Sequence, residues 1–157
     1  MVIEKDKSIE TVQATRTLFL ALMDSLSIDK LNEIPEGFNN NIIWNLGHVI
    51  VSQQILCYKL AGLPLKIDEA YISKYSKGTK PASFIDENEC AFLKQQSTHL
   101  LEELITDIEK GLLDNYTSYT TSFGIPLNSI EDAVKFLTMH EGLHLGYAMA
   151  LKRIVNK

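Results

Sequence analysis

The sequence predicts an all-α fold, a bundle of four helices joined by two long loops. Apolar residues recur at spacings of three and four along four segments, as they do on the buried face of a helix. No segment shows the alternation of apolar and polar residues that is typical of a half-buried strand. Because the chain has 157 residues, we expect a single domain over residues 1–157.

The starts of the four helices are marked by polar residues whose side chains can accept a backbone hydrogen bond. In the third and fourth helices an acidic residue follows three positions later, which is typical of a capped helix start. One further helical turn is expected before Pro35. The predicted caps are Ser8, Asn40 or Asn41, Asp86 and Ser129.

The second helix is unusually apolar. It is expected to end at about Leu60, before Gly62, and it has no charged residue between Asn41 and Tyr58. A helix that is apolar on most sides is buried on more than one side. We therefore expect it to contact a second subunit as well as the core, and we predict a homodimer.

Two long loops separate the helices, over residues 61–85 and about 111–128. Loops of this length in a compact domain are commonly functional. Their tyrosines are candidates to line the mouth of a site: Tyr71, Tyr75, Tyr116 and Tyr119.

Composition excludes several classes of function. The net charge of −5 and the absence of clustered basic residues argue against a nucleic-acid surface. The two arginines, Arg16 and Arg153, are too few for a phosphate clamp. No segment is apolar enough to cross a membrane or to serve as a signal peptide. Two cysteines far apart give no disulfide framework, so we expect a reducing cytoplasm.

Three of the four histidines are candidates for one metal site. His140 and His144 are four residues apart, which places them about 40° apart around a helix and about 6 Å apart along it. His48, on the inward side of the apolar second helix, can supply a third nitrogen. Three neutral imidazoles suit zinc, nickel, iron or copper, and they leave a coordination position open.

Another interpretation of the trio needs no metal. The three histidines can form a buried polar cluster with hydrogen bonds to Asn45, Ser52 and Tyr147. The remaining candidates are not expected to be ligands. His99 lies off the apolar stripe of its helix and is expected on the solvated surface. Cys57 is turned about 180° from His48, and Cys90 is expected to be a partly buried structural thiol.

The segment from His140 to His144 also matches the His-Glu-x-x-His signature of zinc peptidases, with Glu141 as general base. Peptidases of this class usually take a third ligand from downstream of the motif. No His, Asp, Glu or Cys follows His144, so a peptidase is a remote alternative. Glu141 itself either activates a metal-bound water or anchors a neighbouring ligand, or it is an exposed helix residue.

These motifs resemble the DinB/YfiT-like superfamily. The matching segments are Asn41, Trp44, Leu46, Gly47 and His48, then Thr121 to Gly124, and His140 to Gly146. The resemblance spans residues 8–155. It implies a four-helix bundle, often dimeric, with a divalent metal held by His48, His140 and His144.

The resemblance implies an activity class but no substrate. Characterised relatives include thiol-dependent S-transferases and a thiol-dependent maleylpyruvate isomerase. We therefore expect a metal-dependent transferase or related hydrolase that acts on a small molecule with a low-molecular-weight thiol. Zinc or nickel is the expected ion, with iron or manganese as alternatives, and the catalytic residues stay unassigned. A non-catalytic, dimeric, stress-related protein that binds a metal or a ligand is the alternative.

Overall fold

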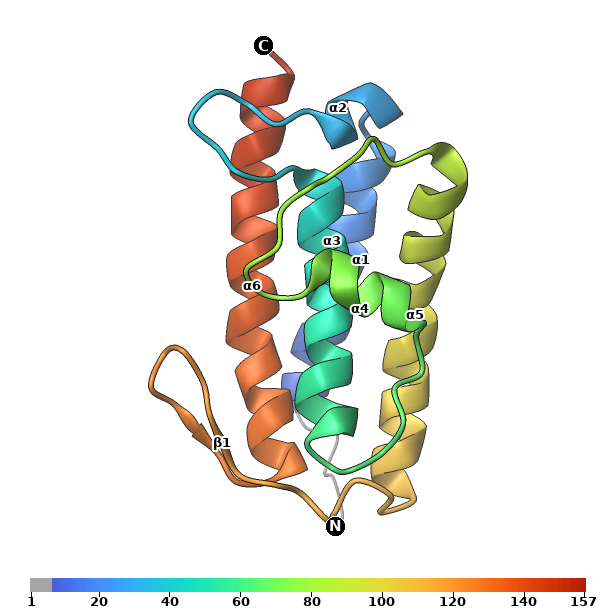
Figure 1. The fold of residues 1–157 in the computed structure, drawn as a ribbon, viewed down its shortest axis with the longest axis vertical. Coiled ribbons are helices and arrows are strands. Elements are labelled where there is room, and N and C mark those ends of the chain that lie inside the picture. Colours follow the sequence, from blue (N-terminus) through green and yellow to red (C-terminus); the bar gives the residue numbers. More distant parts are fainter. Residues whose placement is uncertain (1–6) are drawn as a thin grey trace.

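Four long helices form the body of the structure, a computed structural model that describes residues 7–157. They run along one another as a bundle (Figure 1). Their bounds are Lys7–Asp24 for α1, Ile42–Gln53 for α3, Glu87–Glu109 for α5 and Ile130–Val155 for α6. The predicted all-α bundle is confirmed, and the expected helical turn before Pro35 is α2 (Ile28–Asn32).

Residues 1–6, where the sequence shows no signal-peptide core, lie outside the described part of the chain. Within the described part, no helix is both long and apolar enough to cross a membrane.

Three of the predicted helix caps are confirmed: Asn41, Asp86 and Ser129. In each, the side-chain oxygen accepts a hydrogen bond from the backbone N–H three residues later, at 2.8, 2.8 and 3.2 Å respectively. These bonds satisfy donors that the helix itself leaves free. The expectation for Ser8 is wrong, because α1 already includes Lys7 and Ser8 therefore lies inside the helix.

Helix α3 is the centre of the bundle. Every residue from Ile42 to Gln53 is buried, and the helix packs against α2, α4, α5 and α6 of the same chain. Its apolar surface is therefore covered within one chain. The apolar character of this helix, from which the homodimer was predicted, has an intramolecular explanation.

The second predicted helix ends close to where it was expected, but its last part is not α-helical. α3 continues directly into a π-helical segment, η1 (Gln54–Lys59). There the backbone N–H of Leu60 donates to the carbonyl oxygen of Ile55 at 3.3 Å. This hydrogen bond spans five residues, whereas the bonds of an α-helix span four, so the turn is wider than the α-helix pattern predicts.

The loop predicted over residues 61–85 contains a short helix, α4 (Glu69–Tyr75). Asp68 caps it by accepting a hydrogen bond from the N–H of Ala70 at 2.8 Å. In Figure 1 it lies across α3, and the two helices approach closely at Gly47. A Cβ atom at Gly47 would stand within 3.0 Å of three carbon atoms of the Tyr75 ring. The missing side chain of Gly47 therefore permits this packing.

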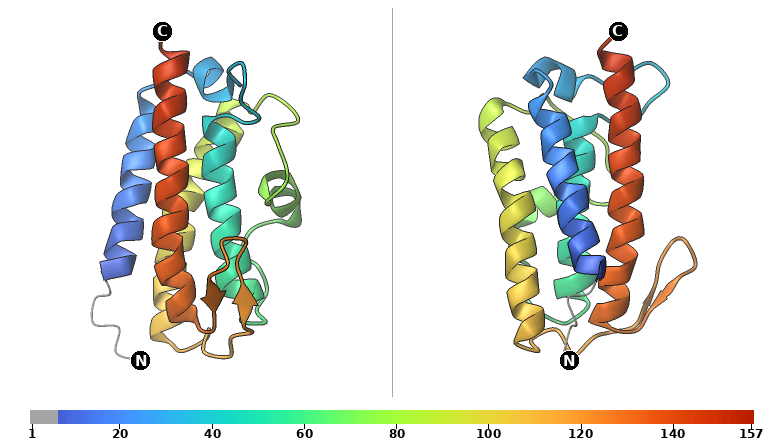
Figure 2. Two further views of the ribbon diagram at one scale, coloured as in Figure 1. Left: turned by 90° about the vertical axis from the view of Figure 1, so that its left-hand side faces the viewer. Right: turned by 180° about the vertical axis from the view of Figure 1, so that it is seen from behind.

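The second predicted loop contains a small antiparallel hairpin. Its strands, β1 (Tyr119–Thr120) and β2 (Pro126–Leu127), pair Tyr119 with Leu127. Gly124 has a φ of 75° in the connecting turn, a conformation that glycine adopts readily. Figure 2 shows the hairpin beside the N-terminal end of α6. It is too short to show the alternation by which strands are predicted.

A buried ion pair joins the first and last helices. The Nη2 and Nε atoms of Arg16 donate to the two carboxylate oxygens of Glu141 at 2.7 and 3.0 Å. Nη1 donates to the carbonyl oxygen of Ser97 on α5 at 2.7 Å. The two charged side chains are only 3% and 1% exposed. One guanidinium therefore connects α1, α5 and α6 inside the bundle.

Arg16→Ala is expected to lower the free energy of unfolding by about 3–5 kcal/mol, because it leaves the Glu141 carboxylate buried without a partner. Lys94→Ala is the control, since it breaks an ion pair with Asp24 in which the side chains are 28% and 68% exposed. It should cost less than about 1 kcal/mol. Urea denaturation measures both, and Arg16→Met/Glu141→Leu should recover most of the loss. Equal losses for Arg16→Ala and Lys94→Ala would contradict the account.

Gly47→Ala is expected to destabilise the protein by about 1–3 kcal/mol, because the added methyl group collides with the Tyr75 ring. Gly146→Ala on α6 is the matched control, since a Cβ atom there has no neighbour within 4 Å. That change should be neutral or stabilising by up to about 1 kcal/mol through helix propensity. If thermal unfolding shows the same shift for both variants, the close contact between α3 and α4 is not a constraint.

Candidate metal centre

The three predicted histidines meet inside the bundle. His48 comes from α3, and His140 and His144 come from α6. Their ring centroids are 4.6 to 5.2 Å apart. One ligand nitrogen from each ring lies within 4.8 Å of the other two. A metal ion with bonds of about 2.0–2.1 Å would draw these atoms somewhat closer together.

Hydrogen bonds to other groups set the tautomers of two rings. His48 Nδ1 donates to the carbonyl oxygen of Tyr75 at 2.8 Å. His144 Nδ1 donates to Oδ1 of Asn45 at 2.7 Å. Both acceptors are oxygens, so the proton belongs to Nδ1 and the lone pair to Nε2. Metal-ligating histidines are commonly oriented by partners of this kind.

His140 completes the set differently. The residue is 9% exposed, and its buried Nδ1 has no hydrogen-bond partner among the described residues. An unpaired polar atom in an apolar interior is unfavourable, so it calls for a ligand. A neutral imidazole with an unused nitrogen beside two others fits a divalent ion such as zinc.

Burial keeps all three rings neutral. Loss of hydration lowers the pKa of His140 to about 3, with help from His144 and His48. The same cause lowers the pKa of His144 to about 4. Burial also lowers the pKa of His48, although the bond to Tyr75 opposes the change. Neutral rings are the form that binds metal.

The metal-free interpretation of the trio is only partly met. Ser52 Oγ lies 3.3 Å from Nε2 of His48, and Asn45 binds His144. Tyr147 instead packs edge-on against Phe38, with ring centroids 5.8 Å apart. Two of the three expected polar partners are therefore present, and they leave His140 Nδ1 unsatisfied.

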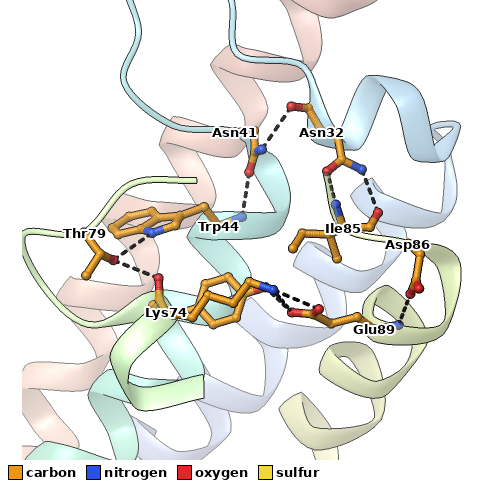
Figure 3. A network of polar contacts seen from close by, with 9 residues as sticks. Asn32, Asn41, Trp44, Lys74, Thr79, Ile85, Asp86 and Glu89 are labelled. Atoms are coloured by element: carbon orange, nitrogen blue, oxygen red, sulfur yellow. Dashed lines mark hydrogen bonds and ion pairs between the residues drawn. The ribbon is translucent and has the colours of Figure 1, made fainter. Parts of the chain in front are cut away.

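A polar network holds the elements around His48 in place (Figure 3). The Trp44 ring stacks on His48 with centroids 4.8 Å apart. Its Nε1 donates to Thr79 Oγ1 at 3.1 Å, in the chain that follows α4. On α4 itself, Lys74 forms an ion pair with Glu89 of α5 at 2.7 Å. The segment that carries the Tyr75 carbonyl is thereby anchored to α3 and α5.

A pocket of about 290 Å³ opens beside the histidines. Its walls come from α3, η1, the β1–β2 hairpin, α6 and the chain after α4. The lining residues are mainly apolar or hydroxyl-bearing: His48, Ser52, Ile55, Leu56, Lys77, Tyr119, Thr121, Ser122, Phe123, Phe136, His140, Leu143 and His144. This size lies at the lower end of the range for small-molecule sites, about 300–1,000 Å³.

Of the four tyrosines predicted to line the mouth, only Tyr119 lines the pocket. The hydroxyl of Tyr75 donates to Glu89 at 2.7 Å, and that of Tyr116 donates to the carbonyl oxygen of Leu56 at 2.8 Å. Tyr71 stacks on Phe92 with centroids 4.9 Å apart. The prediction was wrong for these three because loop tyrosines also serve as packing residues.

Glu141 belongs neither to the pocket nor to the surface. It is 1% exposed, and both of its oxygens accept hydrogen bonds from Arg16. Burial raises the pKa of its carboxyl, and the Arg16 guanidinium opposes that rise. The three expectations for Glu141, that it activates a metal-bound water, anchors a neighbouring ligand or is exposed, are wrong, because both of its oxygens are bound to Arg16 away from the pocket. A peptidase needs a free carboxylate beside the metal, which this ion pair removes.

The other histidine and the two cysteines lie outside the metal site, as predicted. The His99 side chain is 55% exposed and lies 3.5 Å from Glu103. Cys57 is fully buried, and burial raises the pKa of its thiol to about 12. Cys90 is also buried, and loss of hydration raises the pKa of its thiol.

Some of the residues that build the site have no clear signal in the sequence. The Tyr75 carbonyl is a backbone group, and Lys77 is one lysine among several in its loop. Phe136 was identifiable, because it precedes His140 by four residues on the same helix. Its ring stacks on His140 with centroids 5.9 Å apart.

Comparison with known proteins identifies the family. A crystal structure of the conserved protein of locus from Enterococcus faecalis matches with a TM-score of 0.60, covering 99% of this chain and 98% of that one. At 14% identity it shows the fold alone. No curated protein sequence gives a significant match. The sequence model of the DinB superfamily matches residues 11–148, and the chain therefore belongs to the DinB superfamily.

Proposed function

We propose that this protein is a metal-dependent enzyme that acts on a small molecule, as a thiol-dependent S-transferase or a related hydrolase. Its divalent ion is held by His48, His140 and His144, with zinc or nickel as the expected ion and iron or manganese as alternatives. The observation that carries the proposal is the convergence of three neutral imidazoles on one wall of a pocket.

The composition of the pocket favours thiol transfer over hydrolysis. A divalent ion bound there supplies a Lewis acid, which lowers the pKa of a thiol or a water molecule. Among the described residues that line the pocket, none is Asp or Glu, so no carboxylate can take a proton from water. A thiol needs less help, because its pKa is already near 8.5.

The chain's own residues then position the reactants. Hydrogen bonds to Tyr75 and Asn45 fix the rings of His48 and His144. Hydroxyl groups of Ser52 and Thr121 lie along the pocket, where they can donate to a bound substrate. Apolar side chains, among them Phe136, exclude water from the inner wall.

A non-catalytic protein that binds a metal or a ligand, and is dimeric and stress-related, is the second candidate. None of the described residues that line the pocket is Asp or Glu, and this lack of a carboxylate base favours it. In that case metal still binds to the three histidines, but no thiol is conjugated.

Metal binding is expected at one ion per chain and should raise the free energy of unfolding. At a free zinc concentration of 100 times the Kd the gain is about 2.7 kcal/mol. Titration calorimetry and urea denaturation with and without zinc measure both quantities. The His48→Ala/His144→Ala variant should lose the gain, whereas His99→Ala should keep it. If the double variant still binds one metal ion per chain, His48 and His144 are not its ligands and the proposed site is wrong.

Thiol transfer is tested with the zinc- or nickel-loaded protein, monochlorobimane as electrophile and a panel of low-molecular-weight thiols. With at least one thiol, the conjugation rate is expected to exceed the rate without enzyme. His48→Ala should lower it to the rate without enzyme. His99→Ala is the control and should keep the higher rate. If the loaded protein binds metal but accelerates no conjugation, the non-catalytic candidate is favoured.

The predicted homodimer is a separate expectation. Several apolar side chains are exposed on α6 and can provide its surface: Met139, Leu143, Tyr147 and Met149. Light scattering at micromolar concentration should then give twice the 17.7 kDa chain mass. A mass of a single chain would contradict the dimer and leave the metal site unaffected.

A further inference from the structure

The charged side chains that line the pocket are of one sign only. Lys77 lines it, and none of the described lining residues is a carboxylate. The histidines are neutral, so an ion held by them would add its positive charge to that of Lys77. Neither arginine lines this cavity, and Arg16 is already paired with Glu141. The described lining of the pocket therefore carries one cationic side chain and no anionic one.

Lys77 is presented by an anchored turn. The N–H of Thr79 donates to the carbonyl oxygen of Ser76 at 3.1 Å, and Gly78 has a φ of 86°. Thr79 Oγ1 also accepts the bond from Trp44 Nε1, and Figure 3 shows this link between the turn and α3. Because Trp44 stacks on His48, the backbone of Lys77 is fixed relative to the histidines.

Another part of the pocket wall is apolar. Phe136 stacks on His140, and Phe123 of the hairpin packs on Phe136 with centroids 5.9 Å apart. Leu143 extends this wall along α6. Burial against such side chains favours the binding of flat apolar or aromatic groups. The cavity therefore offers an apolar wall, a cation on the turn after α4 and three imidazole nitrogens.

We infer that the pocket selects a small molecule with an apolar body and a single carboxylate, and that Lys77 binds this carboxylate. The body of the molecule lies against Phe123 and Phe136, and its reacting end faces the histidines. A second carboxylate finds no second cationic side chain, since Lys77 is the one charged side chain among the described lining residues. The inference rests on the proposed metal-dependent function, for which it names the substrate class.

The test uses cobalt-loaded protein and two probes that differ only in charge, 4-(mercaptomethyl)benzoate and 4-(mercaptomethyl)benzamide. Each thiol reports its contact with the metal through the absorption spectrum of cobalt, and titration gives its Kd. We expect the benzoate to bind about fivefold more tightly than the benzamide, as a partly exposed ion pair allows. Because this ion pair between Lys77 and the carboxylate is accessible to solvent, salt screens it, and the ratio of the two Kd values should fall as ionic strength rises.

Variants assign the preference to one side chain. Lys77→Gln should raise the Kd of the benzoate to that of the benzamide and leave the Kd of the benzamide unchanged. Lys77→Arg should keep the preference, since the charge is retained. Lys80→Gln is the matched control, because Lys80 is exposed on the same segment but does not line the pocket. It should keep the preference as well.

The outcomes separate this inference from the proposed function. If both probes change the cobalt spectrum with equal Kd, the metal site stands and the role of Lys77 is overturned. The role of Lys77 is also overturned if Lys80→Gln removes the preference as fully as Lys77→Gln does. If neither probe changes the spectrum of the loaded protein, the open metal site fails, and the inference fails with it.

Discussion

The site depends on one constraint, which is the burial of three imidazoles without a counter-charge. Three rings with centroids about 5 Å apart would repel one another if protonated. Burial removes the hydration that a charged ring needs, so all three stay neutral and keep a lone pair. Two of those lone pairs are aimed by hydrogen bonds on the far side of the ring. The bundle thus produces a nitrogen-rich site suited to a divalent ion.

The close packing of α3 and α4 is what orients His48. Since Gly47 has no side chain, the Tyr75 ring lies against the α3 backbone. His48 is the residue after Gly47 on α3, and its Nδ1 donates a hydrogen bond to the carbonyl oxygen of Tyr75. The same segment leads into the turn that carries Lys77 at the pocket. One glycine therefore affects both His48 and the part of the pocket wall that carries Lys77.

Local signals made much of the fold predictable. A cap such as Asn41 or Asp86 acts on an N–H three residues away, so the sequence carries the whole interaction. The histidine pair on α6 was predictable because helix geometry relates positions four apart. Finding His48 needed more, namely a polar ring in an otherwise apolar helix and the resemblance to a known family.

The features that were missed depend on contacts between distant segments. Glu141 looked like a site residue or a surface residue, and its burial depends on Arg16, 125 positions earlier in the chain. The short helix α4 and the hairpin are stabilised by packing on α3 and α6, which no local pattern encodes. The tyrosine predictions failed for the same reason, since Tyr75 finds its partner Glu89 only in the folded chain.

X-ray absorption at the zinc edge of protein loaded with one equivalent of zinc tests the central claim most directly. We expect three imidazole nitrogens at about 2.0–2.1 Å from the zinc ion and, without added thiol, no sulfur ligand. A sulfur ligand at about 2.3 Å would place the ion at a cysteine and contradict the account. So would a shell with fewer than three imidazoles, because His48, His140 and His144 would then not share one ion.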